Sequence, residues 1–346
     1  MRHDELITIP GTAVQITRLG LGTVPIGGLY NEVSPDMAQQ TLAAAYRLGI
    51  RYFDTAPLYG FGLAEQRLGH FLHSSGHRDV TVSTKVGRLL RVPGRTPDGS
   101  SWPAGTDPDD SQVLDGAPIF KGIGALRPVW DFSFDGTLRS VEESLRRLSL
   151  EQVKLLYIHD PEDHMDQAIS GAWRALTRLR DEGVIGAIGV GLDHCWIGER
   201  FVAEAPVDCL LVAGRLTLLD RSAQNSLLPM CSAAGVSIIA GSVFNSGILA
   251  SDTINEDAHY WYSRANPDIV AHAQKLEKIC RKHGIPLRAA ALQFPYRFDP
   301  VTAVVVGARS PDEIADDVAM LNVDIPADLW AELDELPAPE ANGVHE

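Results

Sequence analysis

Four side chains that can hold or move a proton stand at the ends of apolar runs in this sequence. Asp54 and Tyr59 follow one run, whereas Lys85 and His159 each end another. A parallel α/β barrel gathers the carboxyl ends of its strands on one face, and its chemistry takes place there. We therefore expect these four side chains to meet at one end of such a barrel.

The four residue types suit proton transfer coupled to oxidation or reduction at carbon. A tyrosine hydroxyl has an ordinary pKa near 10, and a nearby ammonium such as Lys85 lowers it. Asp54 can orient Lys85, and His159 can polarise a carbonyl or hold an alcohol oxygen. Tyr59 is then the general acid for reduction or the base for oxidation. Each of these residues by itself has an ordinary structural explanation. Such an explanation for all of them together is much less probable, because they stand at three matched strand ends.

Strand and helix signals alternate along the chain and predict a (β/α)8 barrel. We expect one domain over residues 1–346, with its core at about 15–335 and a small hairpin within 7–16. The predicted strands are 17–21, 50–53, 80–84, 153–158, 185–190, 209–213, 237–240 and 303–306. The predicted helices are 64–72, 137–148, 168–179, 222–234, 268–283 and 311–321.

Two long segments, 87–133 and 244–267, interrupt this rhythm. Connections of such length are uncommon in compact domains and are usually functional or disordered. Each follows a predicted strand, so each would lie over the active face. We expect them to cover the substrate and to contribute Trp130 and Phe244 beside Tyr59 and His159. Surface elaboration is the alternative.

Composition narrows the class of protein. The 346 residues carry a net charge of −15, and 45% of them are hydrophobic. An acidic chain is a poor partner for nucleic acid. The N-terminus has no apolar signal region, and no 18-residue apolar run follows. We therefore expect a cytoplasmic protein with a small-molecule substrate and no membrane partner, and its oligomeric state stays open.

Five pieces of this sequence resemble the aldo-keto reductases. They are Leu19–Thr23, Tyr52–Tyr59 with Gly62 and Glu65 beyond it, Ser83–Lys85, Leu156–His159 and Val305–Ser310. The stretch Gly241–Leu249 is similar to the subgroup of L-fucose, D-threo-aldose and L-galactose dehydrogenases and pyridoxal 4-dehydrogenase. The resemblance implies a (β/α)8 barrel closed below by a hairpin, and a catalytic tetrad of Asp54, Tyr59, Lys85 and His159. It also implies NAD or NADP, bound without a Rossmann fold.

The resemblance further implies a set of cofactor contacts at or beyond the strand ends. The set is Gly22, Thr23, Asp54, Gly191, Asp193, Gly241, Ser242, Val243, Asn245, Gly247, Leu249, Gly307, Arg309, Ser310, Glu313 and Asp317. The sequence departs from the family's pattern at Gly191, where a serine is usual, and Asp193 can stand in for that contact. It departs also at Ala213, where a glutamine is usual, and near Gly241, where an aromatic is usual.

The segment around Arg309 bears on the choice of cofactor. Ser310 is expected to cap a helix, with Glu313 completing a capping box, and backbone N–H groups there can also bind phosphate. Four carboxylates, from Asp312, Glu313, Asp316 and Asp317, surround a single arginine, which disfavours a 2′-phosphate. We therefore expect a preference for NAD over NADP.

The expected reaction is oxidation of the anomeric hydroxyl or hemiacetal of a small polar substrate, such as an aldose, to a lactone. The alternatives are a pyridoxal 4-dehydrogenase that forms 4-pyridoxolactone, a general NADPH carbonyl reductase, and a cofactor-binding regulatory subunit. No metal site is expected. The spacing of His70, His73 and His77 is better explained by a solvated helix end. His159 and Asp160 also suit a metal hydrolase, but no His-x-His stands on the first strand.

Overall fold

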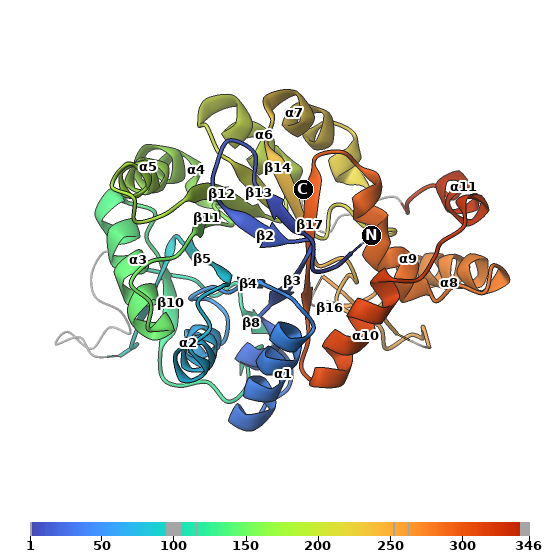
Figure 1. Cartoon of the computed structure of the whole chain (residues 1–346), viewed down its shortest axis with the longest axis horizontal. Helices are drawn as coiled ribbons and strands as arrows, with labels where there is room; N and C mark the ends of the chain where they lie inside the picture. Colours follow the sequence, from blue (N-terminus) through green and yellow to red (C-terminus); the bar gives the residue numbers. More distant parts are fainter. Residues whose placement is uncertain (1, 95–105, 115–116, 252, 262, 340–346) are drawn as a thin grey trace.

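Eight parallel strands close into a barrel in the computed structural model, which describes residues 2–94, 106–114, 117–251, 253–261 and 263–339 (Figure 1). In the order in which they pair around the barrel, the strands are β11 (Leu155–His159), β12 (Ala187–Leu192), β13 (Cys209–Ala213), β14 (Ser237–Gly241), β17 (Val301–Gly307), β3 (Leu19–Gly22), β4 (Tyr52–Asp54) and β5 (Thr81–Val86). The predicted (β/α)8 class is confirmed.

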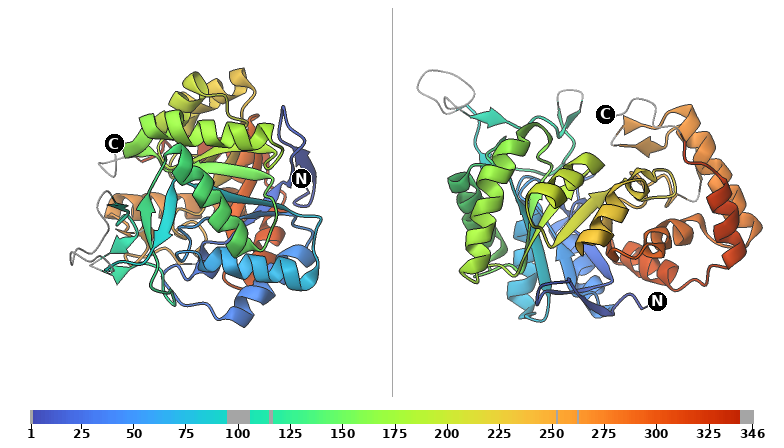
Figure 2. Two further views of the ribbon diagram at one scale, coloured as in Figure 1. Left: turned by 90° about the vertical axis from the view of Figure 1, so that its left-hand side faces the viewer. Right: turned by 90° about the horizontal axis from the view of Figure 1, so that it is seen from above.

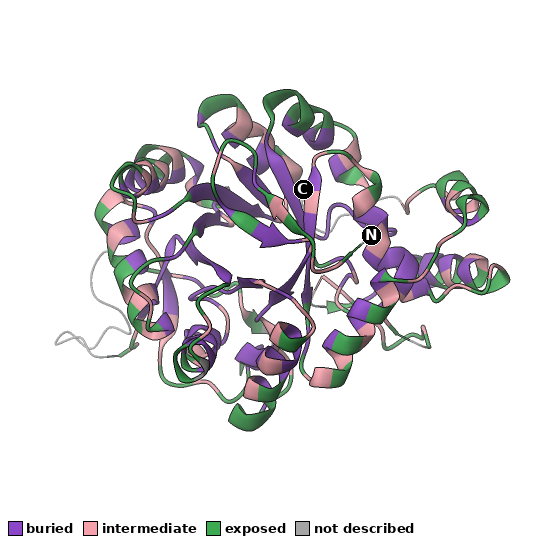
Figure 3. Ribbon diagram, viewed as in Figure 1, coloured by how far each residue is buried: buried purple, intermediate pink, exposed green. Residues whose placement is uncertain are grey.

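Helices surround the barrel and turn their apolar faces inward, as the buried and exposed colours in Figure 3 show. The α-helices are α1 (Pro35–Arg47), α2 (Leu63–Ser75), α3 (Phe134–Leu148), α4 (Met165–Gln167), α5 (Arg174–Asp181), α6 (Cys195–Glu204), α7 (Leu227–Ala234), α8 (Pro267–Lys282), α9 (Leu287–Gln293), α10 (Pro311–Leu321) and α11 (Ala327–Glu335). Short helical turns are Pro25–Gly27, Glu162–His164, Ala168–Trp173, Ser222–Gln224 and Phe294–Arg297. Within the described residues, none of these helices has the length and apolar character needed to span a membrane.

An N-terminal hairpin closes one end of the barrel. Its strands β1 (Leu6–Thr8) and β2 (Gln15–Thr17) pair in antiparallel fashion. The side chains of Ile9, Val14 and Ile16 are buried in the cluster that fills the barrel interior. The right-hand view of Figure 2 places this hairpin at one end of the molecule and the long connections at the other. The open end therefore holds the carboxyl ends of the strands.

The two long segments contain small sheets of their own. After β5, strands β6 (Arg88–Arg91), β10 (Arg127–Trp130) and β7 (Asp107–Pro108) pair antiparallel in that order, and β8 (Val113–Leu114) pairs with β9 (Ala117–Pro118). After β14, β15 (His259–Tyr260) pairs with β16 (Ser263–Arg264). Strands this short leave no alternating pattern that a sequence could reveal.

Candidate active site

The structure brings Asp54, Tyr59, Lys85 and His159 together at the open end. The Lys85 Nζ donates to Asp54 Oδ2 at 2.6 Å and to the Thr55 carbonyl at 2.8 Å. It also lies 4.6 Å from the centroid of the Tyr59 ring. The Tyr59 and His159 rings meet edge to face, with centroids 5.9 Å apart. Three neighbouring strands, β4, β5 and β11, thus supply one compact group, and Tyr59 follows β4.

Burial dominates the electrostatics of this group. Both charged side chains of the Lys85–Asp54 pair are almost inaccessible, at 0% and 3% exposure. Burial lowers the pKa of Lys85, while the charge of Asp54 and its hydrogen bond act in the opposite direction. Burial also holds the pKa of His159 well below its usual value, and Arg88 and Lys85 add to that effect. His159 is therefore a neutral imidazole near neutral pH.

Tyr59 differs from the expectation drawn from the sequence. Burial raises its pKa well above 10, the charges of Asp54 and Asp160 add to the rise, and Arg88 opposes it. The predicted lowering by Lys85 is therefore wrong for the protein alone, because the loss of solvation outweighs the ammonium. Tyr59 is protonated in this state, and of the two carboxylates that add to the effect of burial, Asp160 lies far from Tyr59 in the sequence.

Arg88 anchors the small sheet of segment 87–133 to the catalytic strand end. Its guanidinium donates to Asp109 Oδ2 at 2.5 Å and to the His159 carbonyl at 3.1 Å. The side chains of the Arg88–Asp109 pair are 3% and 1% exposed. The guanidinium also stacks on the Trp130 ring at 3.8 Å. Trp130, an expected substrate contact, is thus held beside His159, whereas Phe244 is half-buried and packs against the main core.

Asp160 is a site residue that the sequence analysis did not assign. It follows His159 in a left-handed conformation, with φ of 43°. Its Oδ2 lies 3.3 Å from His159 Nε2 and 3.6 Å from Arg88 Nη1. Burial raises its pKa to about 7, with Arg88 opposing the rise. The only sequence signal was its adjacency to a histidine at a strand end.

A second acidic cluster lies at the end of β12. Ligand-type atoms of Glu162, Asp193 and His194 lie within 4.8 Å of one another. Burial raises the pKa of Glu162 to about 9, aided by its hydrogen bond to Asp193. Burial also acts to raise the pKa of Asp193, but hydrogen bonds from His194 and Glu162 outweigh it and bring the value to about 2. Glu162 thus shares its proton with Asp193. The expected contact of Asp193 with the cofactor stays a prediction.

The residues expected to hold a nicotinamide cofactor lie around the same open end. Thr23 Oγ1 and Asn245 Oδ1 are buried and have no hydrogen-bond partner within the described residues. A Cβ added at Gly191 would come no nearer than 3.6 Å to any atom, and one at Gly241 no nearer than 3.9 Å. Buried polar atoms without partners are costly, so they suit a polar ligand such as a carboxamide. The residues present therefore fit the cofactor.

The expected phosphate-binding turn is built as a helix start. Ser310 caps α10 by accepting the N–H of Glu313 at 3.2 Å, as expected. The Glu313 carboxylate accepts from the Arg309 N–H at 2.7 Å and from its guanidinium at 2.9 Å. In a capping box, this carboxylate would accept the N–H of Ser310. It accepts from Arg309 instead, so the expected capping box is not formed. Asp317 is buried on the same helix.

Comparison with known proteins agrees with this architecture. The model of the aldo/keto reductase family matches residues 18–338. The chain is 42% identical to D-threo-aldose 1-dehydrogenase of Pseudomonas sp, over 94% of this chain and 96% of that protein. It is 37% identical to pyridoxal 4-dehydrogenase of Microbacterium luteolum, over 96% and 97%. The structure of a glycerol dehydrogenase from Gluconobacter oxydans superposes with a TM-score of 0.74 at 25% identity, covering 96% of this chain and 95% of that one.

Proposed function

Since this chain belongs to the aldo/keto reductase family, we propose that it oxidises the anomeric hydroxyl of an aldose, of the L-fucose or D-threo-aldose type, to a lactone. That it is an NAD(P)-dependent oxidoreductase follows from the family and from its dehydrogenase relatives. The observation that carries the finer proposal is the 42% identity to D-threo-aldose 1-dehydrogenase along nearly the whole chain.

In the proposed reaction, each member of the tetrad has one task. A bound oxidised nicotinamide, held by residues such as Thr23 and Asn245, would supply the hydride acceptor and a positive charge that favours the Tyr59 phenolate. Tyr59 Oη takes the proton of the anomeric hydroxyl as the carbonyl of the lactone forms. Lys85 stabilises the phenolate and is itself held by Asp54 at 2.6 Å. His159 Nε2 holds the reacting oxygen.

Asp160 adds a reason to expect a polyhydroxylated substrate. Its carboxylate lies 3.3 Å from His159 Nε2, so it favours the tautomer that carries hydrogen on that nitrogen. This single N–H can donate to a substrate oxygen once that oxygen takes the place of the Asp160 carboxylate as its acceptor. The side chain is 29% exposed, and its free lone pairs can accept a second hydroxyl of the same substrate.

Turnover of a substrate panel tests the reaction. We expect NADH to form from NAD with L-fucose, L-galactose or D-arabinose, followed by its absorbance. Tyr59→Phe should lower kcat by roughly 10²- to 10⁴-fold, the usual contribution of a general acid or base, while cofactor affinity stays nearly unchanged. Tyr296→Phe is the matched control, because its hydroxyl bonds the Arg18 carbonyl far from the tetrad. Near-normal turnover by Tyr59→Phe would refute the mechanism.

Pyridoxal is the second candidate substrate. The 37% identity to pyridoxal 4-dehydrogenase over 96% of this chain favours it, and its hemiacetal would be oxidised by the same chemistry. Asp160→Ala separates the two candidates. Loss of a hydroxyl acceptor should raise KM for an aldose about tenfold, the effect of about 1.4 kcal/mol, while KM for pyridoxal changes less. A larger effect on pyridoxal would favour the second candidate.

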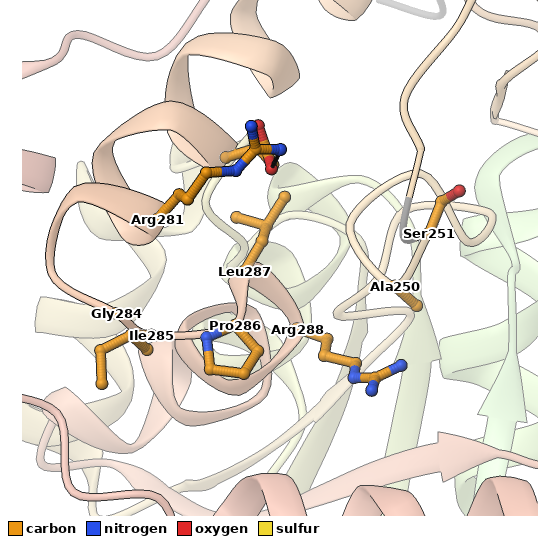
Figure 4. Close-up of a pocket in the computed structure, with 9 residues that line it drawn as sticks. Ala250, Ser251, Arg281, Gly284, Ile285, Pro286, Leu287 and Arg288 are labelled. Carbon is orange, nitrogen blue, oxygen red and sulfur yellow. Dashed lines mark hydrogen bonds and ion pairs between the residues drawn. The ribbon is translucent and has the colours of Figure 1, made fainter.

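The charges near α10 support NAD as the cofactor. Each arginine there has a carboxylate partner: Arg309 pairs with Glu313, Arg288 with Asp316 at 3.2 Å, and Arg281 with Glu277. Arg281 and Arg288 also line a cavity of about 330 Å³ between α8, α9 and residues 250–251 (Figure 4). A 2′-phosphate would have to displace those carboxylates to gain a cation.

The cofactor proposal predicts a higher kcat/KM with NAD than with NADP. Glu313→Gln should shift the ratio toward NADP, because it releases the Arg309 guanidinium and removes one negative charge. Asp312→Asn removes an exposed carboxylate from the same turn without freeing an arginine, so it serves as the control. A wild-type enzyme that prefers NADP would overturn the proposal.

A further inference from the structure

A row of polar side chains runs down the barrel interior beneath the tetrad. Ser83 Oγ lies 2.7 Å from Asp54 Oδ1 and 3.2 Å from the Tyr52 hydroxyl. The Tyr52 and Tyr157 hydroxyls are 2.9 Å apart, and Cys209 Sγ lies 4.0 Å from the latter. All four side chains of this row are buried. The row therefore ends on the carboxylate oxygen that Lys85 does not use.

Two glycines make room for the tyrosine rings. A Cβ at Gly20 would lie 2.5 Å from Tyr52 Cδ1, and one at Gly189 would lie 2.5 Å from two atoms of the Tyr157 ring. Gly189 pairs directly with Tyr157 across the β11–β12 ladder. A side chain at either position would push its tyrosine out of the row. The barrel interior is thus shaped to keep two hydroxyls in line with Ser83.

The protons of this row point in one direction. An ionised Asp54 can only accept, so the single hydroxyl proton of Ser83 goes to Asp54. Tyr52 must then donate to Ser83, and Tyr157 to Tyr52. Burial raises the pKa of both tyrosines well above 10, so both keep the protons that they donate. Hydrogen bonds aligned in this way polarise one another and stabilise the charge at their end.

We propose that Ser83, Tyr52 and Tyr157 are positioning residues whose hydrogen bonds disperse the negative charge of the Asp54 carboxylate and thereby weaken its hold on the Lys85 ammonium, which tunes the ammonium that acts on Tyr59. For turnover this inference rests on the proposed function, whereas its effect on Lys85 does not. Other groups also act on the same ammonium. Besides Asp54, they are Asp160 after β11, Glu65 on α2, His159 with the nearby Arg88, and the Tyr59 and Tyr157 rings at 4.6 Å and 5.8 Å from Nζ. Of these, the Tyr157 ring belongs to the row, and Tyr157→Phe keeps that ring, so the hydroxyls can be altered separately.

Nuclear magnetic resonance of ¹³C-labelled lysine in the intact protein tests the inference directly. The Lys85 signal is assigned by elimination, through Lys→Arg variants at the other lysines. We expect Tyr52→Phe to raise the pH at which Lys85 loses its proton by about half a unit, because the Asp54 carboxylate then keeps more of its charge. Ser83→Ala should raise it more and Tyr157→Phe less, because they lie nearer to and farther from the carboxylate.

Tyr296→Phe is again the matched control, since it also removes a tyrosine hydroxyl that bonds within the protein but has no link to Asp54. It should leave the titration of Lys85 unchanged. With any substrate that is turned over, the alkaline limb of kcat/KM should move to higher pH by the same amount in Tyr52→Phe. An unchanged Lys85 titration in Tyr52→Phe, or an equal shift in Tyr296→Phe, overturns the inference. Absence of turnover on every substrate would overturn only the proposed function.

Discussion

Replacement of Arg88 by methionine should destabilise the protein far more than an ordinary surface change. Arg88 is 3% exposed and pairs with Asp109, which is 1% exposed. Methionine keeps much of the side-chain volume but leaves the Asp109 charge buried without a partner. Removal of one member of such a pair costs about 3–5 kcal/mol, because the remaining charge has lost both water and its partner. The hydrogen bond to the His159 carbonyl and the stacking on Trp130 are lost as well.

A double-mutant cycle separates the pair from its surroundings. Arg88→Met together with Asp109→Leu leaves no buried charge, so the double variant should be more stable than Arg88→Met alone. Urea unfolding followed by circular dichroism gives the free energies of all four proteins. The exposed pair of Arg146 and Glu142 provides the control, and Arg146→Met should cost less than about 1 kcal/mol. A cost for Arg88→Met near that of Arg146→Met, or strictly additive effects in the cycle, would refute this reasoning.

Two further predictions follow from burial. Burial raises the pKa of Asp317 to about 7, with Asp316 and Glu313 adding to the rise and Arg288 opposing it. The folded protein therefore binds this proton more tightly than the unfolded chain, and stability falls as the pH rises from about 4 to about 7. Asp317→Asn should raise the free energy of unfolding at pH 8 by at most about 4 kcal/mol, and the melting temperature should rise with it. The gain should vanish towards pH 4, and a gain equal at all pH values would contradict this. Gly20→Ala should cost about 1–3 kcal/mol, whereas Gly191→Ala, with no contact under 3.6 Å, should cost little; urea midpoints in the reverse order would count against the packing argument.

The barrel was predictable from the sequence because short apolar runs alternate with amphipathic helical segments along the chain, even where a barrel strand is as short as β3 or β4. The strand Cys209–Ala213 and the helix Pro311–Leu321 have the predicted bounds. Strand β4 begins two residues later than expected, and the helix predicted at 168–179 starts with a π-helical turn. Helices α1, α6, α9 and α11 were not predicted. Ser34 before Pro35 is a cap signal that marks the start of α1.

The grouping of the tetrad was also predictable, because strand ends on one face must meet. The surroundings of the tetrad were not. The raised pKa of Tyr59 depends on burial and on charges that include Asp160 and Arg88, which are distant from Tyr59 in the sequence. The Arg88–Asp109 pair joins residues from β6 and from the end of β7, and no local pattern reveals that register. The row from Tyr157 to Asp54 likewise needs three strands to be placed side by side before it exists.

Strands β5 and β14, from which the two long segments leave, are four strands apart in either direction around the eight-stranded barrel. They stand on opposite sides of its mouth. Each segment folds on its own small sheet, so an insertion or deletion in one does not disturb the pairing of the other. A change of length or sequence in one segment therefore leaves the sheet of the other segment, and the barrel strands that carry the tetrad, unchanged.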